Sequence, residues 1–154
     1  MNMNRFYDRI RSPKAAAAAG QPGQTSGFDS LRDSNYTLLV TFKRSGEAVP
    51  TPVWAALGEN GCLYIRTEHD VAKVKRVRNN PHVRVAACSL RGKPRGAVIE
   101  GRARIVAPDE EEHAEAALKS HYGVGRRIYE GTMGAAAGPM VYIEVSPAGQ
   151  EVPA

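Results

Sequence analysis

The feature that most constrains this chain is a series of short apolar segments with strand periodicity, separated by turn residues. Residues 36–42, Tyr-Thr-Leu-Leu-Val-Thr-Phe, are rich in β-branched and aromatic side chains, and Ser45 and Gly46 separate them from a second apolar run over 49–57. Such a pair predicts a β-hairpin. The turn that ends at Gly61 leads into a short strand over 62–67. The first half of the ordered chain is therefore expected to form three antiparallel strands.

The second half of the chain continues this pattern with two helices between strands. Asp70 can cap a short helix in which Val71, Val74 and Val77 recur every third residue, and Pro81 ends it. A second helix is expected from Pro108 and the acidic residues after it to about residue 121, with Gly123 as a stop. Further strands are expected over 83–88, 97–106 and 140–145. Six short strands with few helices favour a mainly β fold, a closed or split antiparallel barrel with flanking helices.

Length and composition fit one domain of this kind. The chain has 154 residues, 42% of them hydrophobic, which is enough for one ordinary domain with a real core. Residues 1–27 include an alanine run and then several glycines and prolines, so they bury little apolar surface. We therefore expect a disordered or loosely ordered N-terminal arm over 1–27 and a single barrel domain over 28–154.

The composition also excludes several classes of protein. No apolar run approaches the roughly 20 residues of a membrane span, and the N-terminal sequence lacks a signal-peptide pattern, so a cytoplasmic protein with no membrane partner is expected. Cys62 and Cys88 are the only cysteines and the four histidines lack ligand spacing, so no metal site is expected. Neither of the common glycine-rich phosphate loops is present in the sequence.

The net charge of +5 is concentrated in one part of the chain. Residues 71–104 contain ten Lys or Arg and one acid, Glu100, which gives +9, whereas residues 109–115 carry −5. The basic stretch indicates an anionic ligand nearby. One alternative is a nucleic-acid or other polyanion surface, but aromatic residues that would stack bases are not interleaved with the basic ones. That surface would use Arg76, Arg78, Arg91, Lys93 and Arg95.

Two segments are candidate binding sites, although either can be purely structural. Residues 49–54, Val-Pro-Thr-Pro-Val-Trp, place two prolines in an apolar strand beside the only tryptophan. Prolines are tolerated at a strand edge or where the backbone faces a ligand. Thr67 ends a strand that leads to a helix with Lys73 and Lys75 near its start, and backbone amides, a hydroxyl and lysine charge together suit a phosphate.

Together these segments resemble the flavin and deazaflavin oxidoreductase superfamily, the FMN-binding-like split β-barrels that include pyridoxamine 5'-phosphate oxidase. The similarity extends from about Phe28 to Pro147 and is strongest over 41–46, 50–54, 64–67, 73–81 and 100–103. The order and spacing are similar to the branch that uses coenzyme F420, an 8-hydroxy-5-deazaflavin with a phosphate and a polyglutamate tail. The resemblance implies a six-stranded antiparallel split barrel and an F420-dependent oxidoreductase.

The resemblance also implies roles for particular residues. Thr67 and Lys73 would hold the cofactor phosphate, and Lys75 or Arg76 would be available to the anionic tail. The deazaflavin ring would be lined by Thr51, Pro52, Val53 and Trp54. The family builds its site between two subunits, which implies a homodimer, with hydride transfer from the reduced deazaflavin to an electron-poor small organic molecule. No catalytic side chain is identified, although Tyr122 or Tyr129 could donate a proton.

One departure from the family pattern bears on the cofactor. Family oxidases that bind FMN commonly present an arginine and a lysine at the two ends of the second strand, where this chain has Thr51 and Ala56. The missing charges favour F420 over FMN and argue against pyridoxamine-phosphate oxidase activity. An FMN- or haem-binding member of the same barrel family is the alternative, and nucleic acid is not an expected partner.

Overall fold

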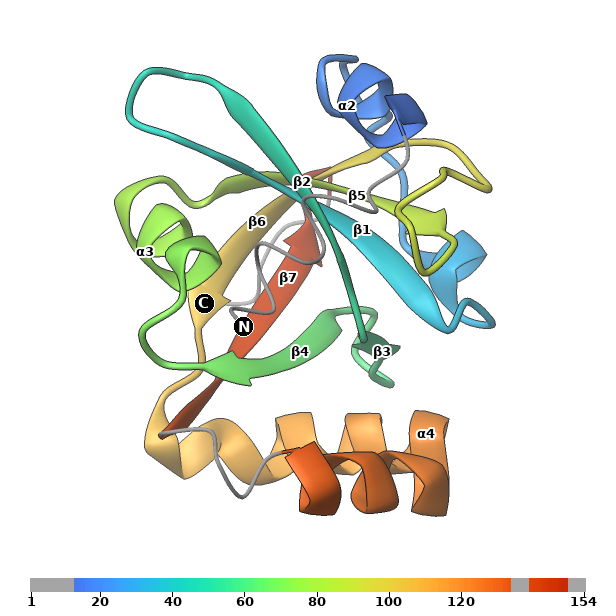
Figure 1. Cartoon of the computed structure of the whole chain (residues 1–154), viewed down its shortest axis with the longest axis vertical. Coiled ribbons are helices and arrows are strands. Elements are labelled where there is room, and N and C mark those ends of the chain that lie inside the picture. The colour runs from blue at the N-terminus through green and yellow to red at the C-terminus, as the bar shows by residue number, and fades with distance from the viewer. Residues whose placement is uncertain (1–12, 134–138, 150–154) are drawn as a thin grey trace.

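The computed structural model describes residues 13–133 and 139–149, and of residues 123–133 it describes the backbone alone (Figure 1). These residues form a curled sheet of seven strands in the order β2-β1-β5-β6-β7-β4-β3, with helices around it. Every pair of neighbouring strands is antiparallel. The predicted mainly β split barrel with flanking helices is confirmed.

The elements have the following bounds. The strands are β1 Tyr36–Phe42, β2 Ala48–Val53, β3 Ala56–Leu57, β4 Leu63–Glu68, β5 His82–Cys88, β6 Ile99–Ile105 and β7 Met140–Pro147. The helices are α2 Pro13–Ala19, α3 Ala72–Asn79 and α4 Glu111–Met133, with short 3-10 helices η1 at Asp29–Leu31 and η2 at Pro108–Glu110. Among the described residues, no helix combines the length and the apolar character that crossing a bilayer requires.

The prediction of six strands is wrong by one, because the strand expected over 49–57 divides in two. β2 pairs with β1 at one edge of the sheet, whereas β3 pairs with β4 at the other edge. The chain crosses between these edges through Trp54 and Ala55. At this point the two edges of the curled sheet are joined by the chain itself and not by pairing of β2 with β3.

Two predicted helix ends also differ from the structure. Asp70 does not cap α3: its carboxylate lies 2.9 Å from Nδ1 of His69, and the cap residue Val71 makes no side-chain capping bond. Gly123 does not stop α4, which continues to Met133. A glycine inside a helix costs only about 1 kcal/mol relative to alanine, so by itself it does not end one.

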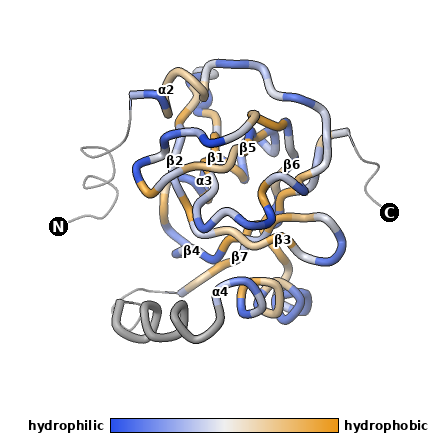
Figure 2. Tube along the Cα trace, turned by 90° about the vertical axis from the view of Figure 1, so that its right-hand side faces the viewer, coloured by the Kyte–Doolittle hydropathy of each residue, from blue (hydrophilic) through white to orange (hydrophobic). Residues whose placement is uncertain are grey.

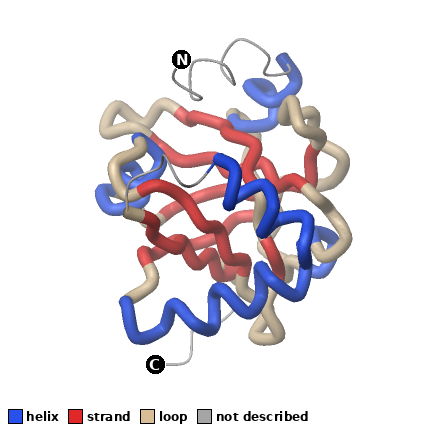
Figure 3. The backbone as a smooth tube through the Cα atoms, turned by 60° about the horizontal axis from the view of Figure 1, so that its bottom comes forward, coloured by secondary structure: helices blue, strands red, loops and turns tan. Residues whose placement is uncertain are grey.

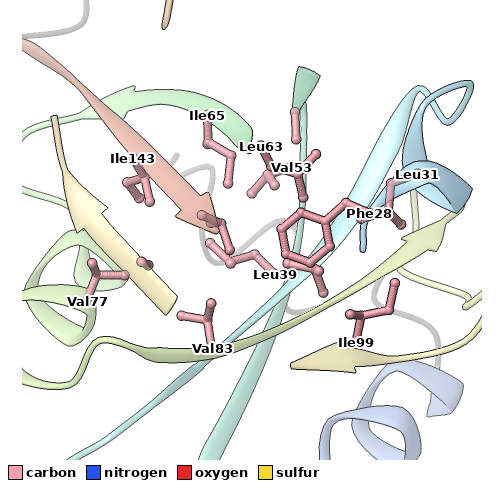
Figure 4. Packing of buried hydrophobic residues seen from close by; sticks show 14 of the residues in the cluster. Phe28, Leu31, Leu39, Val53, Leu63, Ile65, Val77, Val83, Ile99 and Ile143 are labelled. Atoms are coloured by element: carbon pink, nitrogen blue, oxygen red, sulfur yellow. The ribbon is translucent and has the colours of Figure 1, made fainter. Parts of the chain in front are cut away.

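The main core fills the inside of the curled sheet (Figure 4). Leu39 of β1, Val53 of β2, Ile65 of β4 and Ile143 of β7 meet there, and Val77 of α3 closes one end. Side chains alternate across each strand, so the neighbours of these residues face outward. The outward faces therefore need separate covers.

Two helices supply covers for the outer faces. α4 lies along the outside of β3 and β4 (Figures 1 and 3), where Ala114 and Leu118 are buried against Tyr64. Apolar and hydrophilic residues alternate along the turns of its described part (Figure 2), as in a helix with one buried face. α2 packs against β2 on the outer face of the sheet, and its buried alanines share a cluster with Leu38 and Phe42 of β1.

α2 belongs to the predicted N-terminal arm, and the residues after it also contact the barrel. The backbone N–H of Gln24 donates a hydrogen bond to the carbonyl of Val98 at 2.8 Å, and the carbonyl of Gln24 accepts one from the N–H of Glu100 at 2.8 Å. Residues 1–12 lie outside the described residues. The division of the chain at residue 27 stays a prediction.

Candidate functional site

The two prolines of β2 determine which backbone groups are available at its free edge. β2 pairs only with β1 among the described strands. Pro50 and Pro52 have no N–H to donate, so in the antiparallel ladder they occupy the positions that point away from β1. The amide of Thr51 then bonds to Leu39 opposite it. The edge of β2 that no described strand pairs with therefore carries carbonyl acceptors and no donors at both prolines, which are themselves buried.

The four residues predicted to line the ring present different faces of β2. Val53 belongs to the interior core, and Thr51, two residues before it, shares that face. Pro52 pairs with Leu38 and faces the outer side that α2 covers. Trp54 follows the end of β2. Side chains alone therefore do not bring all four residues to one planar ring. A ring that contacts all four must also lie against the backbone at the edge of the strand.

Tyr122 of α4 fixes the crossing between β2 and β3. Its ring stacks on Trp54, with centroids 5.2 Å apart and planes 20° from parallel. Its hydroxyl accepts a hydrogen bond from the N–H of Ala55 at 2.9 Å and lies 2.9 Å from the carbonyl of Ala55 and 2.8 Å from that of Asn35. The hydroxyl proton is therefore engaged with backbone. The structure gives Tyr122 a positioning role that the sequence pattern does not signal, and the side chain of Tyr129 lies outside the described residues.

The residues predicted to hold the phosphate are associated with β4 and α3. Thr67 is buried, with 7% exposed, near the end of β4. Nε of Arg76 donates a hydrogen bond to Oγ1 of Thr41 at 2.5 Å, which ties α3 to the end of β1. Figure 1 shows α3 on the side of the barrel from which the β1–β2 hairpin projects. Lys75 is exposed to solvent.

Among the described lysines and arginines of this region, Lys73 has the pKa that departs most from its ordinary value. Burial lowers its pKa to about 8, the neighbouring Arg76 guanidinium lowers it further, and the carboxylate of Glu68 opposes both. Both residues are half-buried, and the two positive charges lie near enough for the guanidinium to affect the lysine. An anion bound between them would offset their mutual repulsion. The chain therefore has a cation pair that suits a phosphate.

The residues predicted to bind the phosphate and those predicted to line the ring lie near opposite ends of β2. Thr41, which Arg76 contacts, pairs with Val49, so α3 approaches the hairpin end of the strand. Trp54 lies five residues farther on, a span of about 17 Å at 3.3 Å per residue. A ligand that contacts both groups must be elongated.

A concave region lies near the Trp54 end of the sheet. It is a groove of about 760 Å³ bordered by the start of β1 and by the turn after β5, and Asn35, Ser89, Arg91 and Arg95 are among the residues that line it. The sequence shows Arg91 and Arg95 as members of the basic stretch over residues 71–104. The groove is not visible from the sequence, because its other wall comes from residues about 60 positions earlier.

No curated protein matches this sequence at a significant level. The family profile described as pyridoxamine 5'-phosphate oxidase matches residues 28–149. That match covers most of the chain, including every predicted site residue, and it extends over the whole curled sheet.

Several solved structures are similar in fold. A protein of unknown function from Agrobacterium tumefaciens is 17% identical with a TM-score of 0.59, covering 82% of this chain and 56% of its own. A FAD-binding protein from Mesorhizobium loti is 20% identical with a TM-score of 0.54, covering 75% of this chain and 80% of its own. The haem storage protein HutZ from Vibrio cholerae is 13% identical with a TM-score of 0.54, covering 98% and 93%. At these identities the likeness establishes the fold and nothing about ligands.

Proposed function

The chain belongs to the pyridoxamine 5'-phosphate oxidase family, and on this premise we propose that it is an oxidoreductase that uses coenzyme F420 to reduce an electron-poor small organic molecule. The observation that carries the proposal is the cation pair of Lys73 and Arg76 on α3. A lysine whose pKa is lowered to about 8 beside a guanidinium is a site that an anion stabilises. The phosphate and the polycarboxylate tail of F420 supply such anions.

The residues around this pair fit an elongated cofactor. The phosphate would bind at Lys73 and Arg76, and the free edge of β2 leads from there toward Trp54. Because Pro50 and Pro52 remove two donors from that edge, it is not built to pair with another strand and presents carbonyl groups to a ligand instead. A ring seated along it would lie next to the Trp54–Tyr122 stack, which supplies apolar surface that excludes water.

The positions that carry charge in FMN-binding relatives favour F420 over FMN. Thr51 shares the face of the interior core and is partly buried. Ala56 is fully buried beneath α4, in the cluster that contains Tyr64 and Leu118. Neither Thr51 nor Ala56 carries a charge, so an FMN phosphate would lack the ligands that the family pattern provides there.

Reduced F420, held by Lys73 and Arg76, would supply a hydride from C5 of its ring, which one carbon of a conjugated double bond would receive. The protein's residues bind and orient. Lys73 and Arg76 neutralise the phosphate, and Tyr122 keeps the β2–β3 crossing in place through Ala55. The hydroxyl proton of Tyr122 is engaged with the backbone carbonyls of Asn35 and Ala55, so Tyr122 is not proposed as the donor of the proton that the second carbon needs.

We further propose that two copies of the chain form a homodimer, with the cofactor between them. The free edge of β2 borders the proposed ring site on one side only, so a second copy would supply the missing wall. Sedimentation equilibrium of the protein with and without F420 tests this. A monomer at micromolar concentration in the presence of F420 would overturn the dimer.

The cofactor assignment is tested by equilibrium titration of the purified protein with oxidised F420, FMN and haem in parallel. We expect saturable binding of F420, at least tenfold tighter than FMN or haem, and loss of that binding in Lys73→Met. Arg102→Gln is the matched control, because it removes an exposed charge from β6 outside the site. Tighter binding of FMN or haem, or equal loss in both variants, would refute the assignment.

A further inference from the structure

The groove near the Trp54 end of the sheet is separate from the proposed phosphate site and has the size of a small-molecule site. Its volume of about 760 Å³ lies within the range of about 300–1,000 Å³ that is common for such sites. One wall comes from residues 30–36 and the other from residues 87–95. Tyr36 and Cys88, which are register partners in β1 and β5, connect the two walls.

The wall after β5 is an ordered turn. The N–H of Gly92 donates a hydrogen bond to the carbonyl of Ser89 at 2.9 Å, and the N–H of Ser89 donates one to the carbonyl of Lys93 at 3.0 Å. Gly92 has φ +82°, a conformation that favours glycine. The N–H of Arg95 bonds to the carbonyl of Ala87 at 2.7 Å. Arg95 is thus anchored at the rim of the groove by its own backbone.

The wall before β1 is fixed in the same way. The N–H of Ser34 donates a hydrogen bond to the carbonyl of Leu31 at 3.2 Å, and its hydroxyl donates one to the carbonyl of Tyr36 at 2.5 Å. Leu31 is buried in the main core. Both walls are therefore held before any ligand arrives, which lowers the entropy cost of binding.

The chemistry of the lining suits an organic acid. The residues that line the groove include two arginines, Arg91 and Arg95, and one acid, Asp33, which leaves an excess of one positive charge. A guanidinium matches a carboxylate with two parallel hydrogen bonds. Leu90 and Tyr36 add apolar surface to the same groove. The lining therefore favours a molecule with an apolar body and one carboxylate.

The groove also adjoins the proposed ring site. Asn35 lines the groove, and its carbonyl lies 2.8 Å from the hydroxyl of Tyr122, whose ring stacks on Trp54. We propose that the groove binds the electron acceptor of the reaction and selects conjugated molecules that carry a carboxylate, with Arg95 as the residue that recognises it. This inference rests on the proposed function. The hydride would go to the β-carbon and a proton from water to the α-carbon, leaving the carboxylate unchanged.

The test is a titration of ¹⁵N-labelled, cofactor-free protein with cinnamate, and with cinnamamide as its neutral isostere. We expect saturable shifts of the backbone amides of Asn35, Ser89 and Arg95 with cinnamate, and at least tenfold weaker binding of cinnamamide. Arg95→Gln should weaken cinnamate about tenfold, which is the loss of one charge-assisted hydrogen bond. Asp33→Asn should raise the affinity for cinnamate, because it removes a negative charge that repels the carboxylate. Arg102→Gln should leave the affinity for cinnamate unchanged.

Several results would overturn the proposal. Equal binding of cinnamate and cinnamamide would exclude carboxylate recognition, and equal shifts with inorganic phosphate would reduce the groove to a simple anion site. Oxidised F420 is added to the same sample as a separate arm, and it should shift amides of β2 and α3 while those of Ser89 and Arg95 stay unmoved. Shifts of these two amides with F420 would assign the groove to the cofactor tail. Absence of F420 binding would refute the proposed function itself, whatever cinnamate does.

Discussion

The hydroxyl of Tyr122 accepts a hydrogen bond from the backbone N–H of Ala55 at 2.9 Å. Ala55 lies in the crossing that carries the chain from one edge of the sheet to the other, and Tyr122 lies on α4, which covers the outside of the barrel. The same hydroxyl lies 2.8 Å from the carbonyl of Asn35, just before β1. One side chain thus joins the start of β1, the crossing and α4.

Tyr122→Phe should lower the free energy of unfolding by about 1–3 kcal/mol, because the change leaves the buried N–H of Ala55 without its acceptor. Stacking on Trp54 is kept, so the structure should stay folded. Chemical denaturation monitored by circular dichroism measures the change. Tyr36→Phe is the matched control, because its hydroxyl makes no hydrogen bond with the described residues. Equal losses in the two variants would contradict the role given to Tyr122.

Lys73→Met should separate stability from binding. Methionine keeps most of the apolar stem but removes a charge that burial and Arg76 disfavour. The free energy of unfolding at pH 7 should therefore equal or exceed that of the wild type, while the affinity for F420 falls at least tenfold. Denaturation and fluorescence titration measure the two effects. A variant that loses stability and keeps its affinity would show that Lys73 is structural.

The affinity for F420 should decrease as the pH rises through 8. The pKa of Lys73 is lowered to about 8 by burial and by Arg76, so the ammonium is present below that pH and is lost above it. At one pH unit above the pKa about a tenth of the lysine stays protonated, and the dissociation constant should rise up to tenfold. Titrations between pH 6.5 and 9.5 test this. Lys73→Met should show no such dependence over the range, and an identical pH profile in both proteins would exclude Lys73 as the titrating group.

Glu100→Gln should loosen the contact between the N-terminal segment and the barrel. Burial raises the pKa of Glu100, but hydrogen bonds from Gly23, His82 and Arg84 outweigh it and hold the pKa below its ordinary value. The carboxylate therefore stabilises the fold above its unfolded-state pKa, and that contribution is lost as the pH falls from about 5 downward. At pH 7 we expect a loss of about 1–3 kcal/mol for the variant.

Acid titration of stability provides the control for Glu100. The free energy of unfolding of the wild type should decline more steeply below pH 5 than that of Glu100→Gln. Glu59→Gln changes an exposed carboxylate in a turn and should leave the wild-type slope unaltered. Parallel acid profiles for all three proteins would mean that the ion pair with Arg84 and the hydrogen bond from Gly23 contribute nothing measurable.

The sequence predicts the elements of this fold well because its signals are local. The alternation around Gly101 and Ala103 specifies a half-buried strand, and the structure has β6 there with both residues buried. The division of 49–57 into β2 and β3 was not predictable in the same way. It depends on pairing with β1 and β4, which lie on opposite edges of the sheet, and no local pattern encodes that choice.

The candidate site is predictable only in part for the same reason. The basic residues after Thr67 can be recognised in the sequence by their charge. The lowered pKa of Lys73 cannot, because it arises from burial in the folded chain. Alternation along β2 places Pro52 and Thr51 on opposite faces of the strand. Which of these faces is interior and which is covered by α2 cannot be read from the sequence. Tyr122 meets Ala55 across 67 positions of sequence, beyond the reach of any spacing rule.

The central claim is that Lys73 binds the phosphate of F420, and removing the phosphate from the cofactor tests it most directly. The dissociation constants of F420 and of the same deazaflavin lacking its phosphate and tail are measured by fluorescence titration, for the wild type and for Lys73→Met. We predict that the truncated cofactor binds the wild type at least tenfold more weakly than F420, and that this difference shrinks to less than threefold in the variant. An equal ratio in both proteins would contradict it, because the phosphate would then be held somewhere other than at Lys73.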